Sequence, residues 1–111
     1  MYEYRATVAR IVDADTVVLS IDLGFHAHIV QTVRISGIDA PERFTEAGKA
    51  AIASLRELLP AGVKVTTRTE KAAATEKYGR YLAEIWKGGI SIGAEMIAGG
   101  HAVPYDGGKR L

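Results

Sequence analysis

Residues 2–23 read YEYRATVARIVDADTVVLSIDL, and this stretch decides the architecture of the first part of the chain. Two runs rich in Val, Ile, Tyr and Thr, residues 2–12 and 16–23, flank the triplet DAD at residues 13–15. β-Branched and aromatic side chains favour strands, and aspartate favours turns because its side chain bonds nearby backbone groups. The sequence therefore predicts a β-hairpin. An alternating apolar stretch at residues 28–36 predicts a third antiparallel strand in the same meander.

The apolar spacing changes from that of a strand to that of a helix after Pro41. Thr45 is placed to cap this helix, and the turn formers at residues 60–62 end it. Two more strands at 63–69 and 81–87 and a short helix at 90–98 follow. Three strands, a helix, two strands and a helix is the element order of the OB-fold. We therefore predict a mainly β protein of the α+β class, a five-stranded Greek-key barrel with two helices.

The size and composition of the chain limit the kinds of protein it can form. Its 111 residues and 48% hydrophobic content suit one domain with one core, so we expect residues 1–111 to form a single domain. A net charge of +1 means that any affinity for nucleic acid must come from a local arrangement of charges. The absence of cysteine excludes disulfides, zinc–thiolate sites and thiol nucleophiles. No apolar leader follows Met1, so we expect a cytoplasmic protein, with secretion of a processed form left open.

Carboxylates gather at the ends of the predicted strands, where loops converge. Asp13 and Asp15 lie in the first hairpin turn, and Asp39 and Glu42 follow the third strand. Two aspartates and a main-chain carbonyl suit a hard cation such as calcium, with positions left for substrate and water. The alternative is an ordinary turn, because aspartate is favoured there for local hydrogen bonding alone.

Two arginines stand close to these carboxylates or at the end of an element. Arg34 lies inside the third predicted strand, and Arg80 directly precedes the fifth. A guanidinium group offers a rigid fork of donors that matches phosphate oxygens, and phosphoryl transfer needs positive charge in the transition state. The alternative for each arginine is a structural ion pair with a neighbouring acid.

Four segments occur together in one order, namely VDADTV at 12–17, VRISGIDAPE at 33–42, KYGRYLA at 77–83 and GHA at 100–102, which Tyr105 follows. Each segment is weak evidence alone, but the combination is specific. Through these segments the chain resembles the staphylococcal nuclease-like (thermonuclease) family. The resemblance implies an OB-fold barrel, in agreement with the element order, and a calcium-dependent nuclease that cuts phosphodiester bonds in DNA or RNA.

The resemblance also implies a metal site and a residue that acts on water. Asp15 and Asp39 would bind Ca²⁺, with the main-chain carbonyl of Ala40 as a further ligand. Glu42 would act as the general base on the attacking water or would orient it. The metal would serve as a Lewis acid and as a template for the phosphate.

The remaining implied roles concern the nucleic-acid substrate. Arg34 and Arg80 would hold the scissile phosphate and stabilise the transition state. Lys77, Tyr78 and Tyr105 would contact the neighbouring phosphate or stack on a base. Stacking on an aromatic side chain favours bases that are already unpaired, so we expect single strands to be preferred over duplex.

The chain departs from the family in three places, one of which is Ala40 in place of a threonine, a change that a main-chain ligand tolerates. Ala14 replaces the usual glycine of the first turn, and it would be strained if that position needed a positive φ. The chain ends at Leu111, so we expect the third, C-terminal helix of longer relatives to be absent. One side of the barrel would then need another cover, and both a monomer and a homodimer stay open.

Other residues invite a functional interpretation that we do not favour. The three histidines are too scattered for a zinc site, although His26 and His28 would share a face if both lay in a strand. Phe25 and Trp86 are better explained by packing in the core or on a strand surface. Residues 107–110 (GGKR) resemble a phosphate-binding loop only in composition, and we expect a frayed basic tail there.

Two alternatives to an enzyme remain. A nuclease-like domain with weak catalysis could serve as a nucleic-acid-binding module, but such a domain would be free to lose its arginines or Glu42. A generic single-strand binder of the OB type would be expected to show a basic groove with several aromatic residues, which +1 net charge and 7% aromatic content support poorly.

Overall fold

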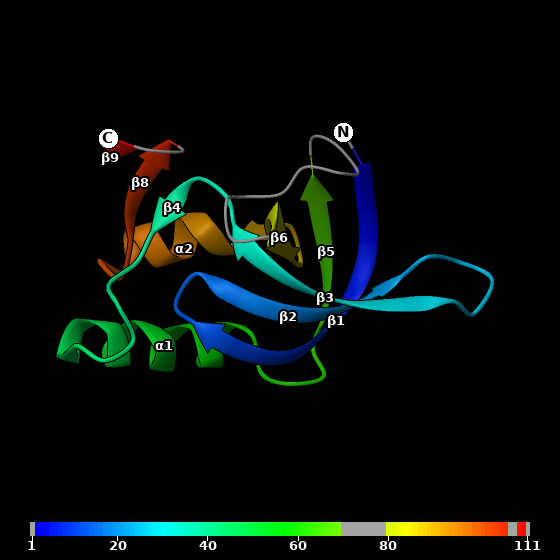
Figure 1. The fold of residues 1–111 in the computed structure, drawn as a ribbon, viewed down its shortest axis with the longest axis horizontal. Helices are drawn as coiled ribbons and strands as arrows, with labels where there is room; N and C mark the ends of the chain where they lie inside the picture. Colours follow the sequence, from blue (N-terminus) through cyan, green and yellow to red (C-terminus); the bar gives the residue numbers. More distant parts are fainter. Residues whose placement is uncertain (1, 70–79, 107–108, 111) are drawn as a thin grey trace.

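The strands of the computed structural model, which describes residues 2–69, 80–106 and 109–110, curl into a closed barrel (Figure 1). The barrel strands are β1 (Tyr2–Asp13), β2 (Thr16–Asp22), β3 (His28–Ile35), β5 (Lys64–Thr69) and β6 (Tyr81–Lys87). Their order is β3-β2-β1-β5-β6, with antiparallel neighbours, and β3 closes the barrel by pairing in parallel with β6. This mixed barrel and the two helices among the described residues confirm the predicted OB-fold of the α+β class.

Strand β1 bends and thereby pairs with two neighbouring strands. Its first half pairs with β5 and its second half with β2, and the register with β2 shifts between Val8 and Arg10 and again between Ile11 and Asp13. Such bulges bend a strand and increase its twist. The bend leaves the β1–β2 turn at one end of the barrel, while the β2–β3 hairpin projects at the other (Figure 1).

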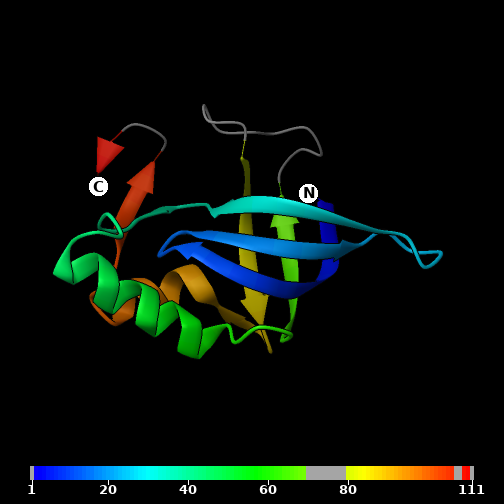
Figure 2. The same cartoon turned by 60° about the horizontal axis from the view of Figure 1, so that its bottom comes forward.

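Helix α1 (Glu46–Leu58) begins where the sequence predicts. The Gly48 N–H donates to Oγ1 of Thr45 over 2.9 Å, which is the expected N-cap bond. The side of α1 that carries Gly48, Ala51 and Leu55 is buried, and Figure 2 shows the helix running beneath the barrel strands.

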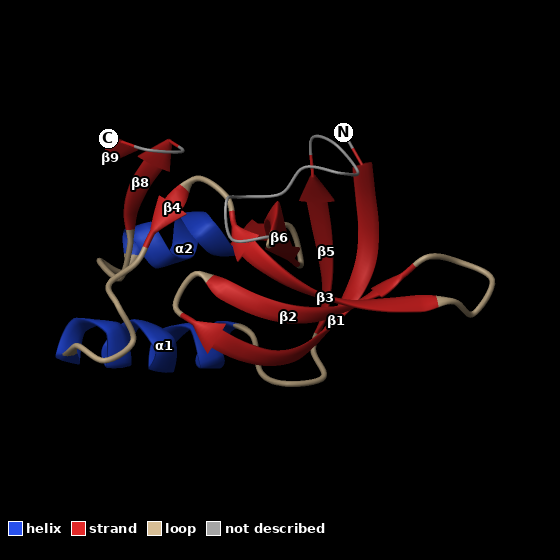
Figure 3. Ribbon diagram, viewed as in Figure 1, coloured by secondary structure: helices blue, strands red, loops and turns tan. Residues whose placement is uncertain are grey.

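The second helix is shorter than predicted. Residues Ile90–Ser91 form strand β7, which pairs with the end of β6, and helix α2 covers only Ile92–Ala98. The helix begins late because the Ser91 hydroxyl caps it, accepting from the Ala94 N–H over 3.3 Å. Both helices lie at the end of the barrel that carries the β1–β2 turn (Figure 3).

Three short strands besides β7 were not predicted. Strand β4 (Ile38–Asp39) pairs with β8 (Val103–Asp106), which in turn pairs with β9 (Lys109–Arg110). The expectation of a frayed basic tail at residues 107–110 is therefore wrong for Lys109–Arg110, whose backbone bonds to β8. Two-residue strands carry too few side chains for an alternating pattern, so the sequence offers no signal for β4 or β9.

The tip of the β2–β3 hairpin overturns the expectation that Phe25 packs against the protein. Phe25 is fully exposed, and both it and His26 adopt positive φ angles of 53° and 62°. The Leu23 N–H closes the turn by donating to the Ala27 carbonyl over 2.9 Å. His26 thus lies in the turn and shares no strand face with His28.

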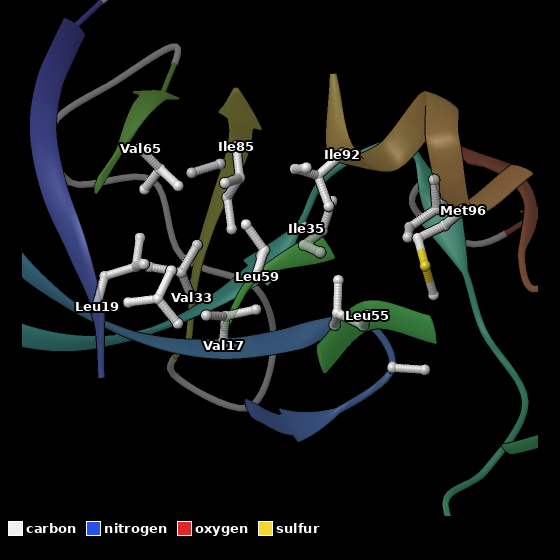
Figure 4. Close-up of a cluster of buried hydrophobic side chains, with 14 of the residues drawn as sticks. Val17, Leu19, Val33, Ile35, Leu55, Leu59, Val65, Ile85, Ile92 and Met96 are labelled. Atoms are coloured by element: carbon white, nitrogen blue, oxygen red, sulfur yellow. The ribbon is translucent and has the colours of Figure 1, made fainter. Parts of the chain in front are cut away.

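One hydrophobic core fills the barrel and the space under both helices. Leu19, Ile35 and Ile85 come from the barrel, Leu55 from α1 and Met96 from α2, and Figure 4 shows them facing one another. In the part of the chain that the structure describes, neither helix is long and apolar enough to cross a membrane.

Ala14 belongs to this core, at 1% exposure. It is not among the described non-glycine residues with positive φ, which are Phe25 and His26. The turn therefore holds alanine without the strain that the sequence left open.

Candidate active site

Asp15 is held in place from two strands and a loop. Its main-chain carbonyl accepts from the Ile35 N–H over 2.8 Å, which ties the β1–β2 turn to the end of β3. Its carboxylate accepts from the Thr16 hydroxyl over 3.1 Å and from the Ala40 N–H over 3.4 Å. At 14% exposure, the side chain is aimed at neighbouring protein groups while it keeps a limited opening to solvent.

Asp13, two residues earlier, has a different environment. Its carboxylate lies 3.8 Å from Nε of Arg43, and both side chains are substantially exposed. Exposed pairs of this kind contribute little to stability. The two aspartates of the first turn therefore differ in environment. Asp13 makes a surface ion pair, and only Asp15 lies in the site.

Arg34 lies between the two aspartates. Strand pairing puts it opposite Thr16, and its Nη2 is 3.4 Å from the Asp15 carboxylate and 3.7 Å from the Asp39 carboxylate. The Arg34 side chain is only 12% exposed, and its desolvated positive charge lies between two negative charges, which outnumber it. The Tyr105 ring covers it, with 5.2 Å from Cζ to the ring centroid.

The turn after β3 brings Asp39 back to this arginine. Gly37 takes a φ of +82°, a conformation open to glycine, and lets the chain reverse into β4. The Tyr105 N–H donates to the Gly37 carbonyl over 2.9 Å, and Asp39 pairs with Val103 of β8. The small sheet that the sequence did not reveal thus positions both Asp39 and Tyr105.

Arg80 joins the same cluster through Thr16. Its Nη1 donates to the Thr16 hydroxyl over 3.0 Å, while that hydroxyl donates to Asp15. Thr16 is 1% exposed and therefore acts as a buried link between an arginine and a carboxylate. The sequence interpretation assigned no role to Thr16, although the motif Asp-x-Asp-Thr held the signal.

Glu42 lies outside this set of contacts. Its side chain is exposed and, within the described residues, makes no hydrogen bond or ion pair. Its main-chain carbonyl is well anchored, because it accepts from the N–H and the hydroxyl of Thr45 over 3.1 and 2.8 Å. The loop position is therefore fixed by the start of α1, while the carboxylate faces solvent.

The structure brings together Asp15, Arg34, Asp39, Arg80 and Tyr105 of the predicted site, with Ala40 beside them. Lys77 and Tyr78 lie outside the described residues.

The oxygen donors near Arg34 could hold a metal ion of the hard-cation type. The described residues contain no group of three or more His, Cys, Asp or Glu side chains that could bind a metal. A site here would therefore combine the carboxylates of Asp15 and Asp39 with main-chain oxygen, for which the Ala40 carbonyl is the nearest in sequence. Oxygen-only donors of this kind suit a hard cation that completes its shell with water.

A comparison with known protein families matches residues 32–110 to the family described as staphylococcal nuclease homologue. A search of curated proteins finds no match. The matched range includes Arg34, Asp39 and Arg80, and the hairpin that carries Asp15 precedes it and docks onto it. Because the match covers well over half of a chain that also has the expected barrel, this protein belongs to the staphylococcal nuclease homologue family.

Proposed function

We propose that this protein is a calcium-dependent nuclease that hydrolyses phosphodiester bonds in DNA or RNA. The observation that carries the proposal is the position of Arg34 between two carboxylates, with Arg80 tied to the same cluster through Thr16. Membership of the family supports a function related to nucleic acid.

The charges of the cluster match the needs of phosphate hydrolysis. Asp15 and Asp39 would hold Ca²⁺ together with the Ala40 carbonyl, and the bound ion would supply Lewis-acid stabilisation of the phosphate. Arg34 would then direct its donors to the phosphate oxygens, because its two carboxylate contacts, at 3.4 and 3.7 Å, are long enough to exchange readily. The donors of Arg80 would add positive charge where negative charge develops in the transition state.

Glu42 is proposed to take the proton from the attacking water or to orient that water. Its side chain is exposed, so its carboxylate is open to a water molecule beside the loop after Ala40. The anchored main chain at Thr45 limits how far this loop can move.

The aromatic wall of the site is proposed to contact the substrate. Tyr105 lies against Arg34, so a base next to the bound phosphate would meet its ring. Lys77 and Tyr78 are proposed to contact the adjacent phosphate and base. A platform of this type tolerates any base and favours unpaired strands.

One assay tests the proposal. The purified protein is incubated with labelled single-stranded DNA, duplex DNA and RNA, either with calcium or with EGTA and magnesium. We expect cutting with calcium and little with magnesium, because two protein carboxylates suit a larger ion of flexible coordination. Glu42→Gln should bind substrate nearly normally and cut it slowly. Binding without any cutting would favour the alternative, a nucleic-acid-binding module.

A further inference from the structure

A second feature that could bind a ligand lies on the outer face of the barrel, further along the strands than the Arg34 cluster. It is an open groove of about 450 Å³ that five barrel strands line. The side chains that matter are Arg5 and Thr7 of β1, Ser20 of β2, Lys64 and Thr66 of β5 and Trp86 of β6.

Strand register aligns these side chains in two rows. Arg5 lies opposite Thr66, which lies opposite Trp86, and side chains at directly paired positions share one face of a sheet. The second row contains Thr7, flanked by Ser20 on β2 and Lys64 on β5. The Lys64 Nζ donates to the Thr7 hydroxyl over 3.2 Å, so the ammonium group is held over the groove.

The groove has unbalanced positive charge. Within the described residues, neither Arg5 nor Lys64 makes an ion pair. The acids next to this region have other partners, because Glu3 pairs with Arg68 at 2.6 Å and Glu84 accepts from the Trp86 indole over 2.8 Å.

Two further titratable groups line the groove. They are Asp22 and His28, which lie opposite each other in the register of β2 and β3. The Asp22 carboxylate accepts from the Gly24 N–H over 2.8 Å. The two cations Arg5 and Lys64 outnumber the single carboxylate of Asp22, so the groove keeps a positive charge. Two cations among hydroxyl groups form a surface that suits a phosphate.

The groove lies along the same sheet face as the Arg34 cluster. Side chains alternate along a strand, so Thr16 and Ser20 of β2 point to the same side. Four residues separate them, or about 13 Å at ~3.3 Å per residue. A stacked nucleic-acid strand, which advances ~3.4 Å per nucleotide, would cover this distance, plus the width of the groove, in roughly four to six nucleotides, and a more extended strand would need fewer.

We propose that this groove binds a phosphate of the same nucleic-acid strand, several nucleotides and at most about six from the cleaved bond. Arg5 and Lys64 bind the phosphate, and the Trp86 ring forms the wall beside the sugar and base. Arg68 stacks on the ring at 4.8 Å and fixes its orientation. The proposal rests on the proposed nuclease function and adds a length requirement for the substrate.

The single tryptophan of the chain reports directly on this groove, because that tryptophan is Trp86. Wild-type protein with calcium is mixed in a stopped-flow instrument with a 20-nucleotide single strand or with a trinucleotide, so that binding is measured before cutting. We expect the long strand to change tryptophan fluorescence and the trinucleotide to leave it unchanged.

A charge-matched pair of double variants tests the residues. Arg5→Ala with Lys64→Ala should weaken binding of the 20-nucleotide strand on the order of tenfold and lower the slope of log affinity against log salt by ~0.7, the value for one phosphate contact on a single strand. Lys49→Ala with Arg56→Ala removes the same charge from α1 and should cause a much smaller change. Both variants should bind the trinucleotide as the wild type does.

The outcomes separate the groove from the nuclease function. If the long strand is cut but the two double variants bind it equally well, the groove proposal is wrong and the nuclease proposal stands. The groove proposal also fails if the bound long strand leaves the fluorescence of Trp86 unchanged. If the wild type neither binds nor cuts either strand, both proposals fail.

Discussion

Arg34 is the residue on which the site depends most, since it is almost buried and contacts both aspartates. A buried charge that loses its partners is costly, so the three side chains must be considered as one unit. Exposed neighbours such as the Asp13–Arg43 pair lack this dependence. The degree of burial therefore distinguishes a charge of the site from a surface charge in this turn.

Replacing Arg34 or Arg80 by Lys should lower kcat/KM on single-stranded substrate by on the order of a hundredfold or more, because an ammonium group cannot aim two donors at one phosphate. Arg56→Lys, on the exposed face of α1, is the matched control and should retain full activity. Rates for both site variants within about threefold of wild type would mean that the arginines serve structural ion pairs only.

Helix α1 acts on the site through its first turn. Thr45 binds the Glu42 carbonyl, and Gly48 packs so closely on the same loop that an added Cβ would collide with the Glu42 main-chain oxygen. Glycine is therefore required here for close approach rather than for an unusual φ. The helix thereby determines the position of a residue that it does not contain.

Gly48→Ala should lower the free energy of unfolding by roughly 1–3 kcal/mol, because the new methyl group has backbone in its way. It should also reduce activity, since the loop that carries Glu42 must move. Glycine to alanine inside a helix otherwise stabilises by up to about 1 kcal/mol. A loss of stability in Gly48→Ala would therefore show that the collision with the loop outweighs the gain in helix propensity.

Gly93→Ala in α2 is the control, because its Cβ would meet Ile38 Cγ2 at an ordinary 3.4 Å. Urea unfolding measures both variants. A stabilised Gly48→Ala protein with full activity would contradict the proposed link between α1 and the Glu42 loop.

The β2–β3 hairpin tip offers a test of backbone strain. Phe25 is fully exposed and has a φ of 53°, which asparagine tolerates better than phenylalanine. Phe25→Asn should raise the free energy of unfolding by about 0.5–1 kcal/mol, part of the 1–2 kcal/mol that a left-handed residue costs.

Phe44→Asn provides the comparison for the hairpin tip, since Phe44 is also exposed, at 77%, but has no positive φ. Its ring lies under the Arg43 guanidinium at 4.9 Å, so this variant should gain no stability. Thermal unfolding of both proteins decides the question. An equal gain for both would assign the effect to lost surface hydrophobicity instead of relieved strain.

At the scale of the whole molecule, the near-neutral charge of the chain means that nucleic-acid binding depends on local contacts. With a net charge of +1, long-range attraction to nucleic acid is weak, and affinity must come from the Arg34 cluster and the surfaces beside it. Substrate form should therefore matter more than overall charge.

A single strand should be cut faster than its own hairpin duplex at equal calcium and salt. The base beside the gripped phosphate must turn onto an aromatic ring, Tyr105 among them, and pairing in a duplex opposes that movement. Stacking contributes roughly 1–3 kcal/mol per base for any base, so little sequence preference is expected. Initial rates provide the comparison, and equal or faster cutting of the duplex would exclude an aromatic platform.

Much of the architecture was readable from the sequence because the signals are local. The β-branched and aromatic composition of residues 2–23, the Thr45 cap and the helical spacing after it predict elements that the structure confirms to within about two residues. The strands β4 and β9 left no such signal, since two residues show no period and their pairing depends on distant chain segments.

The sequence alone determined which residue types the site contains, because Asp15, Arg34, Asp39 and Arg80 stand in a specific order of motifs. Only the tertiary structure decided how these residues are connected. It separates Asp13 from Asp15, inserts Thr16 between Asp15 and Arg80, and covers Arg34 with Tyr105. Except for the Thr16–Asp15 bond, these contacts join residues far apart in the chain, and burial arises only when strands from both halves of the chain close the barrel.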